Sequence, residues 1–172
     1  MNFDDPKKTP KGPKGRDAAK DEANYLDELG RSRVDRLQAE ADLTGNVRAR
    51  YRADMASLEE ERASYVRQVA VDKGLDDAER AKLIAAKDQV IERRRDVAQQ
   101  ALTVALAQED YDLAKAKNDA AQEEVHASID AADSVAARRD GELRLLELQR
   151  QQEEADLDLI LATKATGSAE WS

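Results

Sequence analysis

Only a few side chains in this sequence have the types and spacing that metal binding or catalysis requires. The single histidine, His126, has Glu123 three residues before it and Asp130 four residues after it, so one face of a helix would bring the three together. A zinc site needs further ligands that converge from other elements, and nothing near His126 supplies them. We therefore interpret His126 as a solvated surface residue and predict no metal site.

Clusters of carboxylates are the other candidates, because paired acids can transfer protons in general acid–base catalysis. That chemistry needs burial or a neighbouring charge to shift the pKa of one carboxyl group, and an exposed helix face offers neither. The sequence also contains no phosphate-cradling glycine loop and no nucleophile elbow. We predict no catalytic residue, no cofactor and no enzymatic activity, and interpret as solvated faces the clusters Glu59–Glu61, Asp76–Asp77 and Glu153–Glu154.

Composition favours extended helices over one compact core. The chain has 172 residues, of which 38% are charged and 3% aromatic, and much of its 41% hydrophobic fraction is alanine. A compact domain of this length needs more large apolar side chains. Disorder of the body is the competing interpretation, since a net charge of −9 and low hydrophobicity favour it. The regular helical spacing and the capping residues favour helix.

The same composition restricts partners and chemistry. The net negative charge argues against specific nucleic-acid binding, which needs a basic surface. Because the chain contains no cysteine, it has neither disulfide bonds nor thiolate chemistry. No run of about 18 apolar residues occurs, so we predict no stable membrane insertion.

Residues 75–140 form the stretch around which the chain is organised. They include neither Gly nor Pro and are mostly good helix formers, so we expect a long helical arm. Apolar residues recur every seven positions, with largely polar companions, which is typical of a weak coiled coil. The predicted seam comprises Leu83, Val90, Val97, Val104, Tyr111, Asn118 and Val125, widened by Ile84, Ile91, Ala98 and Ala105.

Turn and capping residues predict an all-α fold of long helices and helical hairpins. Gly45 should stop the first helix and Asn46 should cap the second. Gly74 should cap the second helix before an antiparallel partner, and Gly74→Ala should cost on the order of 1 kcal/mol if its φ is positive. The predicted helices span about 17–43, 47–72, 76–132 and 134–164, after a disordered Pro/Lys/Gly-rich linker over 1–16.

The boundaries of the last two helices are predicted mainly from aspartate and serine capping residues. Asp76, with Glu79 three residues later, resembles a capping box, and Asp76 should pair with Arg80. Asp133–Ser134 either breaks the arm or lies within a continuous helix, and both alternatives stay open. Gly167 should stop the last helix. Ser168–Ser172 then has the pattern of another helix opening, so we expect the chain to be a fragment of a longer protein.

Each shorter helix is predicted to have an apolar face. The second helix should place its seam against the arm, with Glu59–Glu61 and Arg67 on the opposite face. The leucine stripe of the last helix has no cover nearby in the sequence, so we expect a homo-oligomer through helical seams. These faces are Tyr25, Leu26, Leu29, Val34 and Leu37; Tyr51, Met55, Leu58, Tyr65 or Val66, and Val69; and Leu143, Leu146, Leu157 and Ile160, flanked by Leu145, Leu148, Leu159 and Leu161.

Several of these helical segments carry a resemblance to a known family. Residues 136–149 (AARRDGELRLLELQ) and 152–157 (QEEADL) resemble the helical repeat region of phage and prophage tail tape-measure proteins. Residues 51–62 (YRADMASLEEER) and 74–80 (GLDDAER) are similar to other parts of that region, and the first 16 residues to its linkers. The resemblance covers most of the chain from Asp17 onward.

The resemblance implies a structural, non-enzymatic role in tail assembly or length determination. Proteins of this family are helical oligomers in the lumen of the tail tube, so the implied locations are the virion and, during assembly, the host cytoplasm. The implied partners are further copies and tail-tube or tail-assembly proteins. This chain is far shorter than a tape measure, which suggests a short or truncated segment. A generic helical scaffold or adaptor that binds other helices, and a peripheral lipid-binding helical protein, stay open as alternatives.

Overall fold

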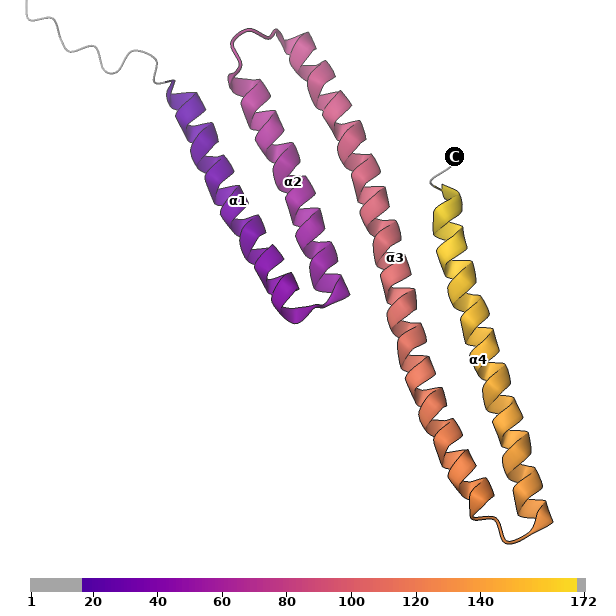
Figure 1. Ribbon diagram of the computed structural model, residues 1–172. Helices are drawn as coiled ribbons and strands as arrows, with labels where there is room; N and C mark the ends of the chain where they lie inside the picture. The colour runs from indigo at the N-terminus through magenta and orange to yellow at the C-terminus, as the bar shows by residue number, and fades with distance from the viewer. Residues whose placement is uncertain (1–16, 170–172) are drawn as a thin grey trace, which may run out of the picture. The chain divides into compact units, whose positions relative to one another are not determined.

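The computed structural model describes the backbone of residues 17–169 and the side chains of residues 17–165. This part of the chain folds into four α-helices without a strand: α1 (Ala18–Thr44), α2 (Val47–Val71), α3 (Asp77–Asp130) and α4 (Val135–Ala169) (Figure 1). The predicted all-α fold of long helices joined in hairpins is therefore confirmed. The linker expected over residues 1–16 and the residues around Trp171 lie outside the described part.

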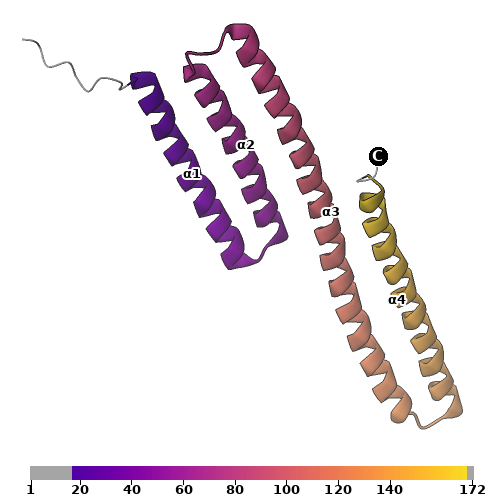
Figure 2. The same ribbon diagram turned by 45° about the horizontal axis from the view of Figure 1, so that its top comes forward.

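The chain divides within α3 into two compact units, one up to Ala98 and one from Gln99 onward. In unit 1, α1, α2 and the first part of α3 lie side by side with α2 in the middle (Figures 1 and 2). Contacts between α2 and its neighbours show that the order is antiparallel, since Arg67 reaches Asp27 of α1 and Arg62 reaches Asp88 of α3.

The junction of α1 and α2 follows the local signals in the sequence. The Asp17 carboxylate begins α1 by accepting a hydrogen bond from the Ala19 amide at 3.1 Å. Gly45 ends α1 with a left-handed φ of 62°, and its amide donates to the Ala41 carbonyl. The Asn46 side chain then accepts from two amides in the first turn of α2. The predicted stop and cap are both confirmed.

The prediction for Gly74 is wrong in its mechanism. Helix α2 already ends at Val71, and the residue that caps it is Asp72, in an extended conformation. Gly74 does not have a positive φ; its amide donates to the Asp72 carboxylate at 2.9 Å. The turn is therefore closed by an aspartate side chain that accepts a backbone hydrogen bond two residues on, and glycine is not required for it.

Helix α3 begins with the predicted aspartate cap. The Asp76 carboxylate accepts from the Glu79 amide at 2.7 Å, and these hydrogen bonds hold the pKa of Asp76 below its ordinary value. Arg80 interacts electrostatically with Asp76, as predicted, but the carboxylate that its guanidinium contacts, at 3.2 Å, is that of Asp77. It also donates to the Val69 and Asp72 carbonyls at the end of α2. A cation on α3 therefore donates to carbonyls at the C-terminal end of α2, where the helix dipole favours positive charge.

The arm breaks before Asp133–Ser134, which resolves the two alternatives left open above. Helix α3 ends at Asp130, and the Ser134 hydroxyl accepts from the Ala137 amide at 3.1 Å as α4 begins. The predicted stop at Gly167 is wrong, because α4 continues to Ala169. A glycine inside a helix lowers the stability of the helix without necessarily ending it.

Small side chains form the contact between α1 and α2. Ala41, Ala49 and Ala53 form a buried cluster against which Leu37 packs. Alanine in these positions allows two helix backbones to approach closely, because interaxial distance depends on the side chains at the contact. The other buried residues of these two helices are Ala23, Asp27, Val34, Ala56, Leu58 and Val69.

The apolar face predicted for the first helix is partly wrong for the same reason. Val34 is buried and Leu37 packs on the cluster, but Tyr25, Leu26 and Leu29 are exposed. The face that contacts α2 runs through small or polar residues instead. On it lies Gly30, where a Cβ atom would overlap the Glu60 carboxyl group of α2.

The seam predicted for the start of the arm is also displaced by one residue. Leu83, Val90 and Val97 are 38%, 48% and 53% exposed, whereas Ile91 is 2% exposed and Ile84 half-buried. Both stripes repeat every seven residues, so the sequence alone cannot separate them. The contacts of α3 with α2 select the stripe that contains Ile91.

Unit 2 is a hairpin of the second part of α3 and α4. The two helices run antiparallel, since Tyr111 contacts Asp156 and Asn118 contacts Leu148. Here the predicted seam of the arm is used, because Asn118 is buried and Tyr111 and Val125 are half-buried. Near the turn, Gly141 lets α4 approach closely: a Cβ there would lie 2.5 Å from Cγ1 of Ile129.

Candidate functional site

The polar side chains of unit 1 converge on α2 from both sides. Asp27 of α1 is 6% exposed and accepts hydrogen bonds from Arg67 at 2.9 Å and Gln68 at 2.8 Å. Burial alone would raise the pKa of Asp27, but the hydrogen bonds from Arg67, Gln68 and Ser64 outweigh it and lower the pKa. Arg67 also pairs with Glu60 of its own helix. This buried group is therefore fully paired.

A second set of charges joins α2 to α3. Glu61 accepts from Lys87 at 2.6 Å and from Arg94 at 2.7 Å, and these cations lower the pKa of Glu61. Arg62 donates to both oxygens of Asp88, at 2.5 Å and 3.2 Å. The Lys87 ammonium also lies 5.3 Å from the centre of the Tyr65 ring, within cation–π range. Each of these charges has a partner on the neighbouring helix.

The interpretation of Glu59–Glu61 as one solvated face is therefore wrong for two of its members. Glu59 is exposed, but Glu60 and Glu61 are half-buried between helices. The physical reason is that α2 has a neighbour on each side. Glu60 lies toward α1, and Glu61 pairs with Lys87 and Arg94 of α3. The predicted apolar seam of α2 is in place, with Leu58 and Val69 buried and Tyr65 against Lys87.

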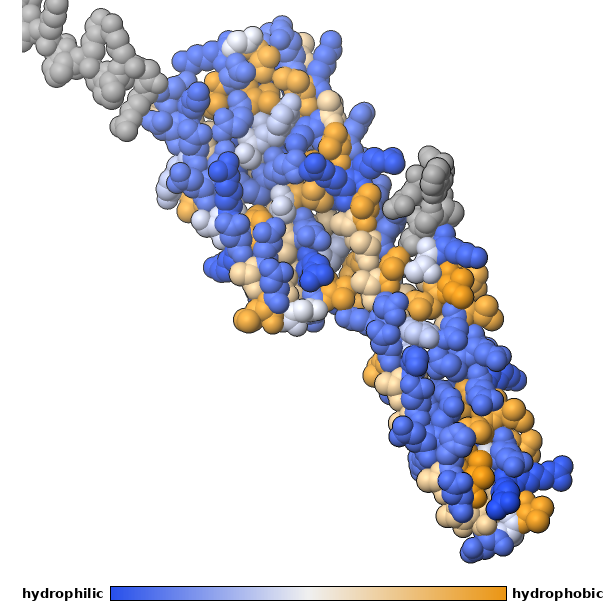
Figure 3. Space-filling view, viewed as in Figure 1, coloured by the Kyte–Doolittle hydropathy of each residue, from blue (hydrophilic) through white to orange (hydrophobic). Residues whose placement is uncertain are grey.

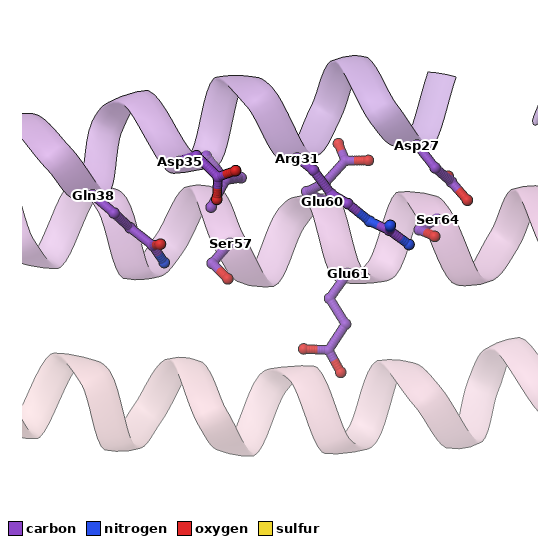
Figure 4. A pocket seen from close by; sticks show the side chains of 9 residues that line it. Asp27, Arg31, Asp35, Gln38, Ser57, Glu60, Glu61 and Ser64 are labelled. Carbon is purple, nitrogen blue, oxygen red and sulfur yellow. The ribbon is translucent and has the colours of Figure 1, made fainter. Parts of the chain in front are cut away.

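A shallow groove of about 370 Å³ lies between α1 and α2 (Figure 4). Arg31, Asp35 and Glu60 project into the space between the two helices, whereas Glu61 points toward α3. The carboxylates that line the groove include those already paired with Arg67, Lys87 and Arg94. The lowered pKa values of Asp27 and Glu61 suit ion pairing, whereas a general acid would need a raised pKa. The lining is Asp27, Arg31, Val34, Asp35, Gln38, Ser57, Glu60, Glu61 and Ser64.

The other residues weighed for chemistry do not converge. His126 is exposed on α3, and so are Glu123 and Asp130. Glu153 and Glu154 are exposed on α4, with Glu154 3.4 Å from Arg150. Among the described residues, no three His, Asp or Glu side chains lie close enough together to hold a metal ion.

Unit 2 contains a polar cluster that sequence reasoning missed. The Tyr111 hydroxyl donates to the Asp156 carboxylate at 2.6 Å, and Gln152 donates to the same oxygen at 2.9 Å. The hydrogen bond to Asp156 raises the pKa of Tyr111 and lowers that of Asp156. The available signal was Tyr111 itself, the one aromatic residue of the arm, at a seam position.

Asn118, seven residues after Tyr111 on α3, occupies a buried seam position. It is 8% exposed, donates to the Leu148 carbonyl at 2.8 Å and accepts from Gln122 at 2.5 Å. A buried Asn at such a position favours the register in which its polar atoms have partners. The polar residues of unit 2 therefore fix how α4 lies on α3.

The most prominent surface feature of unit 2 is a row of large apolar side chains on α4. Leu148 faces α3 and is buried, but five other apolar residues are between 47% and 65% exposed. Figure 3 shows apolar side chains reaching the surface along the α4 side of this unit. We call this set the outer face of α4: Leu143, Leu146, Leu157, Ile160 and Leu161.

Of the apolar residues predicted for the last helix, some are thus covered by α3 and the others are exposed. Leu145 and Leu159 are half-buried together with the buried Leu148, because α4 folds back on α3. The outer face lies on the other side of α4. Groups of exposed apolar residues on one side of a helix mark binding surfaces for protein or lipid. None of the described helices has a segment long and apolar enough to span a bilayer.

Comparison with known proteins gives no relative from which a function could be transferred. No family model, no curated protein and no solved structure matches the chain. The functional conclusion therefore rests on the surfaces and on the sequence resemblance.

Proposed function

We propose that this chain is a structural, non-enzymatic helical protein that binds other helices through the outer face of α4. The observation that carries this proposal is the exposure of Leu143, Leu146, Leu157, Ile160 and Leu161 on one helix. Burial of a leucine side chain contributes about 1.5–3 kcal/mol, so a partner helix that covers several of them gains substantial free energy. The paired charges of unit 1 support a structural role rather than a catalytic one.

We further propose that the setting is tail assembly in a phage or prophage, as a short tape-measure-type segment. The support is the sequence resemblance, and the segment 136–149 that carries it includes Leu143 and Leu146 of the outer face. Within each unit the helices run antiparallel, so their lengths do not add end to end. A role in length determination would therefore require the hairpins to open. The proposed locations are the tail-tube lumen and the host cytoplasm during assembly.

The alternative is a helical scaffold or adaptor in a different assembly. The same outer face supports it, since the face fits any amphipathic partner helix. The two proposals differ in where the protein accumulates rather than in how it binds.

Mass spectrometry of purified tail particles and of the lysate of the same cells would test the setting. We expect peptides of this chain in the tail fraction, and their loss when Leu146 and Leu157 are both changed to Asp. Leu113→Asp is the matched control, because Leu113 is 58% exposed on α3 and outside the outer face. A chain that is abundant in the lysate but absent from tail particles would overturn the tail proposal in favour of the scaffold.

A further inference from the structure

The outer face of α4 has a spacing that identifies its partner. Along the side of the helix opposite Leu148, residues follow one another at alternating steps of three and four, which is the seam of a heptad pattern. Its outer four members belong to the outer face, and its central two are the exposed residues Arg150 and Glu153. We call this set the outer seam: Leu143, Leu146, Arg150, Glu153, Leu157 and Ile160.

The outer seam has the same layout read from either end. Two apolar residues, two charged residues and two apolar residues follow one another, and the centre lies between Gln151 and Gln152. An arrangement of this kind matches a two-fold axis, which pairs each residue with a counterpart at equal distance on the other side of the centre. The outer seam is therefore complementary to a second, antiparallel copy of itself.

We propose that α4 binds α4 of a second copy of this chain in an antiparallel, two-fold arrangement. This inference rests on the proposed helix-binding function and names its partner. In such a pair Leu143 meets Ile160 of the other copy, and Leu146 meets Leu157. Arg150 meets Glu153 twice, once on each side of the axis. Two layers of apolar contact on each side thus flank two ion pairs at the centre.

Charge decides the direction of this pairing. A parallel pair would place Arg150 beside Arg150 and Glu153 beside Glu153, and like charges at such positions oppose association. An antiparallel pair shifted by one heptad would place these charges against leucine or isoleucine side chains. At the ends of the favoured pair Arg139 and Lys164 approach each other, but both are exposed, so solvent and salt screen them.

The side chains at the centre are free to change partner. Arg150 is 73% exposed, and its ion pair with Glu154 lies within one exposed helix turn. Such exposed pairs contribute little to stability. Arg150 can therefore leave Glu154 and pair with Glu153 of the other copy at little cost in free energy. The contacts of α4 with α3, through Gln152, Asp156 and Leu148, lie on the opposite side of the helix and stay intact.

Disulfide trapping tests this arrangement directly, because the natural chain contains no cysteine. Leu146→Cys and Leu157→Cys are prepared separately in the full chain and oxidised mildly, alone and as a mixture. We expect a disulfide-linked dimer mainly in the mixture, where Leu146→Cys faces Leu157→Cys across the axis. Leu113→Cys mixed with Leu157→Cys is the control and should give only background, and circular dichroism checks that each variant is folded.

Charge exchange gives an independent readout. Arg150→Glu should weaken self-association by about five- to tenfold, since both central ion pairs become repulsive. Arg150→Glu combined with Glu153→Arg should restore the affinity of the natural chain. Dimers in the single-cysteine samples alone, or equal affinity of all charge variants, would overturn the antiparallel arrangement. A monomer in every folded sample would overturn self-association. If the chain does not self-associate but is still present in tail particles, the proposed function stands and only this inference is overturned.

Discussion

At the scale of single residues, the most constrained group is the Asp27 carboxylate. It is buried, and Arg67, Gln68 and Ser64 all donate to it. We predict that Asp27→Asn lowers the free energy of unfolding by about 1–3 kcal/mol, because the amide cannot accept all of these bonds and leaves donors without partners. Urea denaturation followed by circular dichroism would measure this. Asp54→Asn, at an exposed position of α2, should change stability by less than about 0.5 kcal/mol. Equal effects of the two substitutions would contradict the role of Asp27.

Gly141 is the second residue whose environment is specific. A Cβ there would lie 2.5 Å from Cγ1 and 3.3 Å from Cδ1 of Ile129, in the side chain of a packed residue. Overpacking of this kind costs about 1–3 kcal/mol, and alanine regains about 1 kcal/mol in helix propensity. We predict that Gly141→Ala destabilises unit 2, by a net amount on the order of 1 kcal/mol.

Gly74→Ala is the comparison for this prediction. Gly74 has no positive φ, and a Cβ there would meet only the Asp72 carboxylate at 3.2 Å. Its substitution should change stability by less than about 0.5 kcal/mol. Thermal unfolding of both variants would show the difference, and a more stable Gly141→Ala variant would mean that the two helices of unit 2 can separate at no cost.

At the scale of helices, the boundaries set by local hydrogen bonds could be predicted from the sequence. Asp17, Asn46, Asp76 and Ser134 each bond to an amide two or three residues on, so the signal lies within one turn. The ends of α2 and α4 could not be predicted from glycine alone. The end of α2 is closed by the Asp72 side chain and by an arginine of α3 instead of by a glycine cap at Gly74. Helix α4 continues through Gly167.

The packed faces of the helices were less predictable, because they depend on how many neighbours a helix has. Glu60 and Glu61 look like a solvated face until α1 and α3 are placed on either side of α2. Val90 and Ile91 belong to stripes with the same seven-residue spacing, and only the partner helix decides which one is buried. Long-range pairs such as Asp27 with Arg67 leave no local pattern in the sequence.

The ion pairs between helices predict how stability depends on pH. The pKa values of Asp27, Glu61 and Asp88 are lowered by hydrogen bonds and ion pairs that the unfolded chain lacks. The unfolded state therefore binds protons more readily, so the stabilisation is complete above the ordinary carboxyl pKa and is lost as pH falls through and below it. We predict that the free energy of unfolding falls below about pH 5.

Urea denaturation at a series of pH values would measure this dependence. The variant with Asp27→Asn, Glu61→Gln and Asp88→Asn should show a smaller decrease over the same range, because its three side chains no longer titrate. An equal decrease in the natural chain and in this variant would show that other groups are responsible.

At the scale of the whole molecule, the described helices bury few large side chains and leave many on the surface. Ile91 is the largest fully buried side chain, and alanines and ion pairs supply much of the remaining contact in unit 1. The leucines of α4 are instead concentrated on its outer face. A structural protein that functions by binding another helix accounts for this distribution, and a catalytic role does not require it.

Sedimentation equilibrium of the purified chain over a range of concentrations tests this claim most directly. We predict a reversible dimer whose fraction rises with concentration. The variant with Leu146→Asp and Leu157→Asp should remain monomeric while retaining the helical circular dichroism of the natural chain. A natural chain that is helical and stays monomeric at the highest soluble concentration would contradict the account, because the outer face of α4 would then be a solvated surface.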